Sequence, residues 1–304
     1  MRRRTGLTKK RLAAATALLL LLGMAASWLL GSILVRPTPS QIPPPTPPGS
    51  DLTLRSSDGL DVAATYWPSR TAGGPAVLLL HGNNASRAAT AANAAWLAGQ
   101  GYAALAIDLR GHGESAVAPR SFGLYESRDA AAALAWLKNR RGHARVAIVG
   151  ISLGGASALI GEKGPLPADA LVLQAVYPDI RSAIRNRIAG ILGHPPALLL
   201  EPLLSYQSHL RLGQPPSRFS PLRAIAAYKG PVLLIGGGED HHTPPSEIRA
   251  LYNAAPGPRS LWIAPGLNHP GVSDVRSQAY RARLLAFLRA TVGPPFPRPA
   301  ETRT

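Results

Sequence analysis

The sequence predicts an α/β domain, built on a largely parallel sheet with helices on both faces and preceded by one membrane-spanning helix. Short, continuously apolar segments alternate with helical patterns along most of the chain, which is typical of parallel sheets buried on both sides. A long uncharged segment lies near the N-terminus. The 304 residues suffice for that segment and one domain of about 250 residues.

The predicted strands and helices follow one another in regular alternation. The first two strands have no helix between them, so we expect an antiparallel edge hairpin that turns around residues 57–59. Strands are expected at residues 52–54, 62–67, 76–80, 102–107, 146–149, 170–173, 232–235 and 261–263, and helices at 88–100, 125–139, 154–161, 245–254 and 274–290.

Residues 12–35 carry no charge and form the predicted membrane anchor. As a helix this segment would extend about 36 Å, against a hydrocarbon core of about 30 Å. Six basic side chains lie within residues 1–11, which we therefore expect to stay in the cytoplasm as a basic tail, with the remainder on the far side of the membrane. The alternative is a signal peptide cleaved at the small residues 25–27, which would make the protein secreted.

Proline-rich segments flank the predicted domain, which spans residues 50–292. Residues 36–49 favour extended polyproline II, so we expect a stiff spacer. Residues 293–304 are proline-rich and charged, which predicts a disordered tail. Residues 181–228 are too long for a plain connection between strands, so we expect a small cap inserted there.

Composition excludes several classes of function. The chain has no cysteine, so it has no disulfide, no cysteine-based metal site and no cysteine nucleophile. The formal net charge is +17, but beyond the N-terminal tail the basic residues are spread out, without aromatic residues interleaved in a basic stripe. We therefore expect no nucleic-acid partner, and a basic surface that favours anionic lipid headgroups.

The segment Gly-Ile-Ser-Leu-Gly at residues 150–154 directly follows a predicted strand and precedes an alanine-rich helix. G-x-S-x-G in this setting is the nucleophile-elbow pattern, a tight turn that presents the hydroxyl of Ser152 above the sheet. Gly150 and Gly154 are expected because side chains there would clash with the neighbouring strand and helix. The helix N-terminus favours developing negative charge at Ser152.

Acyl transfer from such a serine needs fixed donors for an oxyanion, commonly backbone N–H groups. The N–H of Leu153, just after the serine, is one candidate. The N–H of Asn83, on the loop after strand 76–80, is the other. His81 on that loop is expected to brace it, and Asp108 and His112 are expected to serve a hydrogen-bonded loop beside the site.

A general base and an acid should follow the serine in the chain. His269 lies in a loop after the last strand, from which it can reach over the sheet edge, and is the expected base. Among the carboxylates, order alone leaves Asp179, Glu239 and Asp240 open, whereas Asp274 follows His269 closely and is expected to begin the last helix.

Residues 239–242, Glu-Asp-His-His, also allow a metal site. Adjacent histidines rarely bind one ion, and the spacing matches no metal motif, so we expect neither a metal nor another cofactor.

Six segments together resemble the α/β-hydrolase superfamily, and most of all its serine aminopeptidase-like and monoacylglycerol-lipase-like members. Their order and spacing match over residues 50–292. The resemblance implies the fold, a Ser–Asp–His triad, and hydrolysis of an ester, thioester or amide. The segments are HGNN at 81–84, DLRGHGES at 108–115, GLYESRD at 123–129, VGISLGGASAL at 149–159, PVLLIGGGEDHHTPP at 231–245 and GLNH at 266–269.

The same resemblance selects the acid. The family pattern places it four residues before the proline of the next helix, and Pro244 then points to Asp240. The sequence departs from the pattern after strand 232–235, where Gly236-Gly237 stands in place of a His-Gly pair. We expect this difference to alter loop packing only.

The sequence therefore predicts a membrane-anchored serine hydrolase with Ser152 as nucleophile, His269 as base and Asp240 as its orienting acid, acting on a small or lipid-like acyl substrate. Leu and Ile side chains at 188–204 would line an apolar acyl pocket under the cap. An acyltransferase would use the same residues, and a non-catalytic binding protein of the same fold is the third alternative. Neither the oligomeric state nor the acyl group follows from the sequence.

Overall fold

The computed structural model describes residues 4–69, 73–142 and 144–293. Helices and strands alternate along the chain, and short 3-10 turns are labelled η. The elements are α1 Arg4–Leu34, β1 Thr38–Pro39, β2 Ser50–Arg55, β3 Asp61–Trp67, β4 Ala76–Leu80, α2 Ala88–Gly99, β5 Ala103–Ile107, β6 His112–Gly113, α3 Glu126–Arg141, β7 Val146–Ile151, α4 Leu153–Leu159, β8 Ala170–Gln174, α5 Ile180–Leu192, α6 His194–Ser205, α7 Gln207–Leu212, η1 Pro216–Arg218, α8 Pro221–Ala224, η2 Ile225–Ala227, β9 Val232–Gly237, α9 Pro245–Ala254, β10 Arg259–Ala264, η3 Pro270–Ser273 and α10 Gln278–Thr291.

The main sheet of the described chain has eight strands in the order β10-β9-β8-β7-β4-β5-β3-β2. The strands from β10 to β5 pair in parallel, while β2 and β3 form the expected antiparallel hairpin at one edge. Because the carboxyl ends of parallel strands meet at one edge, the loops after β4, β7, β9 and β10 lie at the same edge of the sheet.

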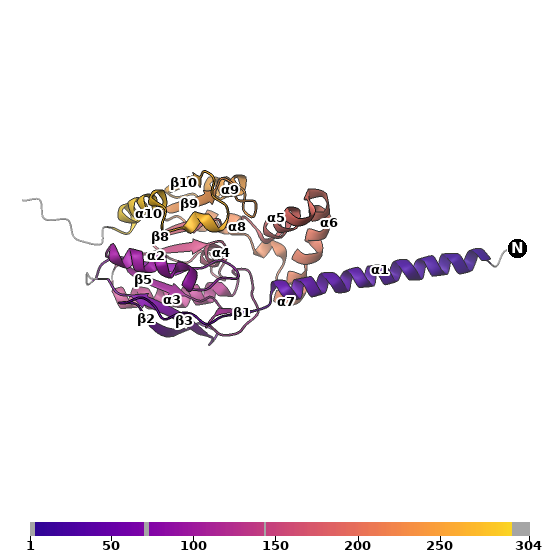
Figure 1. The fold of residues 1–304 in the computed structure, drawn as a ribbon, viewed down its shortest axis with the longest axis horizontal. Helices are drawn as coiled ribbons and strands as arrows, with labels where there is room; N and C mark the ends of the chain where they lie inside the picture. Colours follow the sequence, from indigo (N-terminus) through magenta and orange to yellow (C-terminus); the bar gives the residue numbers. More distant parts are fainter. Residues whose placement is uncertain (1–3, 70–72, 143, 294–304) are drawn as a thin grey trace, which may run out of the picture.

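Helices cover both faces of the sheet, as Figure 1 shows. Strand β4 is fully buried: Leu78 and Leu80 belong to the apolar cluster that includes α3 and α4, and Val77 and Leu79 to the one that includes α2 and α10. This two-sided burial is the reason that the central strands are continuously apolar and do not alternate with polar residues. The predicted fold class is therefore confirmed.

Every strand and helix predicted outside the cap is present in the structure, with its ends shifted by at most a few residues. The largest shift is at the last helix, which begins at Gln278 and not at Asp274. Ser277 caps α10 by accepting a hydrogen bond from the N–H of Tyr280, and Asp274 instead pairs with Arg276. The expectation that Asp274 begins this helix was wrong, because a serine nearer the apolar stretch supplies the cap.

The segment between β8 and β9, expected as a cap, forms α5, α6, α7 and α8 with two 3-10 turns. Helices α5 and α6 pack against each other. The chain turns between them at Gly193, whose φ of 85° favours glycine. Buried Glu201 on α6 accepts hydrogen bonds from the guanidinium of Arg181 on α5, at 2.8 and 2.9 Å, which ties the two helices together.

Helix α1 projects from the body as a long rod whose C-terminal end lies beside α7 (Figure 1). Its segment Lys9–Leu34 has 26 residues and contains an 18-residue stretch with a mean hydropathy of 2.2 that is 11% buried, so the segment is long and apolar enough to cross a membrane by length and composition. The expected anchor 12–35 falls almost entirely within it, with Val35 just past the end of the helix.

The proline-rich segment after α1 is extended, but it lies along the domain and is not a free spacer. Thr38 and Ser40 donate backbone hydrogen bonds to Gly111 and Gly113, so β1 pairs with β6. The carbonyl of Thr46 accepts a hydrogen bond from the indole of Trp67 at 3.2 Å. These contacts hold the end of α1 close to the body, which the sequence did not predict.

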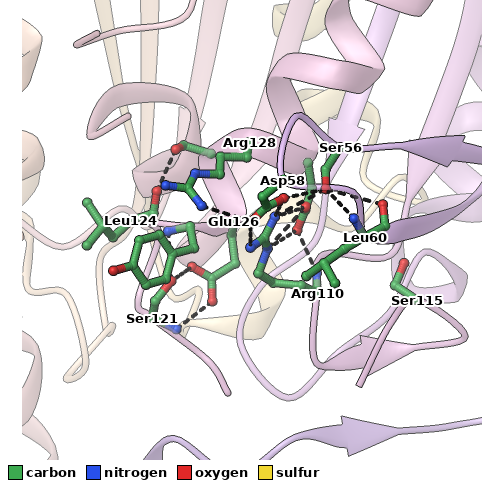
Figure 2. Close-up of polar contacts among 12 residues, drawn as sticks. Ser56, Asp58, Leu60, Arg110, Ser115, Ser121, Leu124, Glu126 and Arg128 are labelled. Carbon is green, nitrogen blue, oxygen red and sulfur yellow. Dashed lines mark hydrogen bonds and ion pairs between the residues drawn. The ribbon is translucent and has the colours of Figure 1, made fainter. Parts of the chain in front are cut away.

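Buried ion pairs connect the loops beside the sheet edge. Arg110 pairs with Asp58 at 2.6 Å, and Arg128 shares Asp58 at 2.8 Å (Figure 2). Arg110 also pairs with Asp129 at 2.7 Å. Burial alone would lower the pKa of Arg110, but the hydrogen bonds to Asp58 and Asp129 outweigh it and raise that pKa. Two of the segments that carry the family resemblance, residues 108–115 and 123–129, thus hold these loops in place.

The expected bracing role of Asp108 is also visible. Its carboxylate accepts backbone hydrogen bonds from Arg87 and Glu114, and it pairs with the guanidinium of Arg87. A Cβ at Gly113 would lie 2.2 Å from this carboxylate, so the loop can close only around a glycine.

Candidate active site

Ser152 occupies the turn between β7 and α4 with a φ of 48°, a value that non-glycine residues rarely adopt. It is 4% exposed, and its N–H donates to the carbonyl of Gln174 on the neighbouring strand at 2.8 Å. The predicted strand–turn–helix setting of the serine is therefore present, with the strain that belongs to a nucleophile elbow.

The two elbow glycines are needed for the reason that the sequence suggests. A Cβ at Gly150 would lie 2.6 Å from the backbone of Gly155 on α4, and a Cβ at Gly154 would lie 2.4 Å from the carbonyl oxygen of Leu80 on β4. Both obstacles are backbone atoms, which cannot rotate away. The elbow therefore packs directly against its own helix and the adjacent strand.

Asp240 and His269 are joined directly, although 29 residues separate them in the chain. The Nδ1 of His269 lies 2.7 Å from the Oδ2 of Asp240, so Nδ1–H donates to the carboxylate. Asp240 is 2% exposed, whereas the side chain of His269 is partly open to solvent.

The neighbours of Asp240 keep its carboxylate ionised. It accepts hydrogen bonds from the N–H groups of His242 and Thr243, at 2.8 and 2.9 Å, and from the hydroxyl of Thr243 at 2.6 Å. Burial raises the pKa of Asp240, but the hydrogen bonds from His269 and Thr243 outweigh burial, and the pKa lies below its ordinary value. A buried, charged and fixed carboxylate suits an imidazole that gains a proton.

Backbone contacts fix two loops against each other. One follows β9 and carries Asp240 (the acid loop), and the other follows β10 and carries His269. Gly238 donates to the carbonyl of Ala264 at 2.8 Å, and Glu239 donates to that of Leu267 at 3.0 Å. A Cβ at Gly237 would lie 2.2 Å from the carbonyl oxygen of Leu267. The glycines after β9 therefore let the two loops approach closely enough for the Asp240–His269 contact.

Ser152 and His269 both follow parallel strands at the same edge of the sheet, but they do not form a hydrogen bond with each other. Among the described residues, neither the Ser152 hydroxyl nor the Nε2 of His269 has a hydrogen-bond partner. Such hydrogen bonds are often long in the absence of substrate and shorten when it binds.

Two backbone donors on either side of the elbow are free. Within the described chain, the N–H groups of Asn83 and Leu153 donate to no protein acceptor. The loop after β4 lies against the serine, since a Cβ at Gly82 would be 3.8 Å from the Cβ of Ser152. These are the two groups that the sequence suggests for an oxyanion hole.

His81 braces this loop. Its Nδ1 lies 2.7 Å from the carbonyl oxygen of Gly82, and its Nε2 accepts from the N–H of Leu109 at 3.0 Å. Burial lowers the pKa of His81 to about 3, so the ring is neutral at physiological pH. With both nitrogens engaged in the protein interior, His81 has no free atom for general-base catalysis.

The other carboxylates considered from the sequence do not contact His269. Asp179 caps α5 by accepting from the N–H of Ser182 at 2.8 Å. Glu239 is exposed to solvent, and Asp274 binds Arg276. The geometry therefore favours Asp240, which chain order alone did not select.

The remaining histidines downstream of the serine are placed differently. His209 stacks on Tyr206 near α7, and the exposed His242 contacts the ring of His269 edge-on at 5.2 Å. Over the described ranges, no group of three or more His, Cys, Asp or Glu side chains is arranged to hold a metal ion.

Arg120 is a residue that sequence analysis missed, and no motif in its loop marks it. Its guanidinium donates to the side-chain oxygens of Asn83, at 2.9 Å, and Asn84, and to the carbonyl of Ile33 at the end of α1. Its N–H donates to the carbonyl of Val35 at 2.9 Å. Arg120 thus connects the end of α1 to the loop that carries one of the free donors.

Because Arg120 is buried, its contacts depend on the arginine side chain itself. Arg120 is 4% exposed, forms no ion pair with a carboxylate in the described chain, and has its pKa lowered by burial. Its guanidinium is therefore held mainly by neutral amide and carbonyl oxygens, which accept hydrogen bonds from the planar fork of an arginine better than from a lysine.

Comparison with known proteins places the chain in a family. Residues 74–205 match the family described as "Serine aminopeptidase, S33". The uncharacterized protein Rv2307c of Mycobacterium tuberculosis is 34% identical over 226 residues, which cover 73% of each chain. The chain belongs to the α/β-hydrolase superfamily, as the sequence resemblance implies.

Solved structures show the same fold. The esterase Pf2001 of Pyrococcus furiosus superposes with a TM-score of 0.69 at 21% identity, over 86% of this chain and 99% of its own. A membrane phospholipase A, described as a bacterial virulence factor, superposes with a TM-score of 0.57 at 18% identity, over 95% of this chain and 99% of its own. Membership of this superfamily supports the conclusion that the chain is a hydrolase.

Replacing Arg120 tests whether the end of α1 positions the loop after β4. In Arg120→Lys the fork that holds Asn83 and Asn84 is lost, so kcat for a short ester should fall about tenfold with little change in KM, less than the loss of an oxyanion donor itself. Arg211→Lys is the matched control, because Arg211 also bonds α1 but does not contact the loop. Steady-state kinetics in which both variants lose activity equally would contradict this role for Arg120.

Proposed function

We propose that the chain is a membrane-anchored serine hydrolase that cleaves acyl esters through an acyl-enzyme formed on Ser152. The observation that carries the proposal is the buried Asp240–His269 pair, at the same sheet edge as a strained elbow serine whose hydroxyl is unpaired. Nucleophile, base and orienting acid are the three parts that such a mechanism requires.

In the first half of the proposed reaction, the Oγ of Ser152 attacks the ester carbonyl carbon while Nε2 of His269 takes the hydroxyl proton. Asp240 stabilises the resulting imidazolium through Nδ1. The N–H groups of Leu153 and Asn83 bind the oxyanion of the tetrahedral intermediate, where fixed donors have the largest effect. The intermediate collapses, the C–O bond to the alcohol breaks, and the proton on Nε2 leaves with the alcohol.

Water completes the reaction. His269 removes one of its protons as the water oxygen attacks the acyl carbon, and the second tetrahedral intermediate uses the same two N–H donors. When it collapses, Ser152 recovers its proton from His269 and the carboxylic acid departs. The names of the structural neighbours, an esterase and a membrane phospholipase A, support an ester, and a lipid-like one, as the substrate.

The anchor is part of the proposal, with the N-terminus in the cytoplasm and the catalytic domain on the extracytoplasmic side. Its length and hydropathy fit a membrane span. Its contacts favour retention over cleavage as a signal peptide: Arg211 donates to the carbonyl of Trp28 at 2.6 Å, and the Ser27 hydroxyl donates to that of Leu203 at 2.9 Å. Cleavage near residue 27 would leave Ser27 and Trp28 at the new N-terminus, without the preceding turns of helix that hold them in place.

Asp240→Asn should lower kcat by about 10⁴-fold, because the amide stabilises the wrong imidazole tautomer. Glu239→Gln, one residue away and exposed, is the matched control and should stay within about twofold of the unmodified protein. The measurement is kcat on a short p-nitrophenyl ester, with circular dichroism to show that both variants fold. An active Asp240→Asn variant combined with a crippled Asp179→Asn variant would contradict the assignment.

Full-length protein with one epitope tag before Met1 and another after Thr304 tests the anchor. After alkaline carbonate washing, immunoblots of the membrane pellet should detect both tags on the same band, because about 20 or more apolar residues hold a helix in the bilayer. Loss of the N-terminal tag, with a mature N-terminus near residue 27, would show a cleaved signal peptide instead.

A further inference from the structure

An apolar groove lies between α1 and the helices of the cap. Its volume is about 570 Å³, within the range of about 300–1,000 Å³ for small-molecule sites. Gly23, Ala26 and Leu30 line it from α1, and Ile188, Ile191 and Leu203 line it from α5 and α6. The sequence predicted the contribution of the cap to an acyl pocket, but not that the anchor helix is its other wall.

Specific polar contacts hold the two walls together. Gln207 on α7 donates from Nε2 to the carbonyl of Ser27 at 2.9 Å, and Arg211 donates to the hydroxyl of Ser32 at 2.9 Å. The guanidinium of Arg211 also lies 3.8 Å from the ring centre of Trp28, a cation–π contact. Because hydrogen bonds and a ring contact fix the helix, the groove is a defined site and not a chance gap.

The outer side of the groove continues into an exposed apolar surface. Ile191 at the end of α5 is 82% exposed, Leu199 on α6 is 76% exposed and Leu210 on α7 is 79% exposed. Large apolar side chains on three successive helices are thus left open to solvent. Since α1 beside them has the length and hydropathy of a membrane span, these side chains lie at the depth of the lipid chains once α1 is inserted.

Helix α5 connects the groove to the loop that carries Asp240. Asn186 donates to the carbonyl of His242 at 3.1 Å and to the carboxylate of Glu247 at 2.8 Å, which fastens α5 to the acid loop. Arg187 on the same helix lines the groove and interacts electrostatically with Asp240.

Arg187 brings to this end of the groove a positive charge that forms no direct ion pair, although Asp240 and Glu247 act on it at longer range. The only hydrogen bond shown for its guanidinium within the described residues is to the carbonyl of Ala183 on its own helix, and no carboxylate lies within ion-pair distance. Burial lowers its pKa, which shows that the cation pays a desolvation cost in this position. An anionic ligand group would offset that cost.

We propose that the groove binds one acyl chain of an anionic ester lipid, which enters sideways from the membrane between α1 and the cap and places its phosphate beside Arg187. The argument for this occupant is charge complementarity at the inner end and continuity of the outer end with the apolar surface of α1. The inference rests on the proposed function, since it names the substrate of the same catalytic site.

Filling the groove from the anchor side is the first test. A Cβ at Gly23 meets no atom within 4 Å, and Gly23 lines the groove, so Gly23→Phe adds a ring on the α1 side of the groove. Ala25→Phe is the control, because Ala25 lies on the same exposed helix but does not line the groove. In full-length protein in nanodiscs, Gly23→Phe should raise the ratio of kcat/KM for p-nitrophenyl acetate over p-nitrophenyl palmitate at least about tenfold, since buried methylenes drive chain binding. Ala25→Phe should leave that ratio unchanged.

The charge is tested with two lipids of equal chain length. Arg187→Gln should lower kcat/KM for palmitoyl lysophosphatidylglycerol about tenfold more than it lowers kcat/KM for uncharged monopalmitoylglycerol, because a charge-assisted hydrogen bond to phosphate is lost. Equal losses on both lipids would overturn the phosphate assignment.

The outcomes separate this inference from the proposed function. If the unmodified protein hydrolyses no ester, including the acetate, the proposed function fails. If it hydrolyses the acetate but Gly23→Phe and Ala25→Phe behave alike on the palmitate, the groove is not the acyl site. If cross-linking through Gly23→Cys shows a second copy of the chain seated in the groove and the palmitate ratio does not change, the occupant is that copy and the lipid proposal is overturned.

Discussion

The turn at Ser152 depends on contacts between backbones that leave no room for side chains. Strand β7 and helix α4 meet so closely that Gly150 touches Gly155, and Gly154 lies against the carbonyl of Leu80 on β4. This packing supports a φ of 48° at Ser152, a conformation that would relax in an isolated peptide. The parallel order of β4, β7, β9 and β10 then brings the loops with the free N–H donors, Asp240 and His269 to the same edge.

Helix α1 and the α/β domain form one connected structure. Arg120 contacts the last turn of α1 and the side chain of Asn83, while Arg211 contacts α1 from the cap. The proline-rich segment that follows α1 is bonded along the domain and not left as a free tether. In the membrane-anchored enzyme that we propose, a domain attached in this way would keep one orientation at the membrane surface, which suits a substrate that is itself held in the membrane.

Much of the fold followed from the sequence because the strands are short, apolar and regularly separated by helices. The elbow was predictable because Gly150, Ser152 and Gly154 act within one local turn. The choice of Asp240 was harder, since the contact to His269 spans two loops and chain order leaves other carboxylates open. The role of Arg120 could not be predicted at all, because its partners come from α1 and from the loop after β4, and no local pattern encodes such a contact.

The central claim is that Ser152 is an activated nucleophile. A fluorophosphonate probe should label the full-length protein stoichiometrically, and peptide mass spectrometry should place the adduct on Ser152. Ser152→Ala should abolish labelling with a Tm shift of no more than a few degrees, since it removes one hydroxyl from a largely unchanged turn. Undiminished labelling of the folded Ser152→Ala variant, or an adduct on a different residue, would contradict the account.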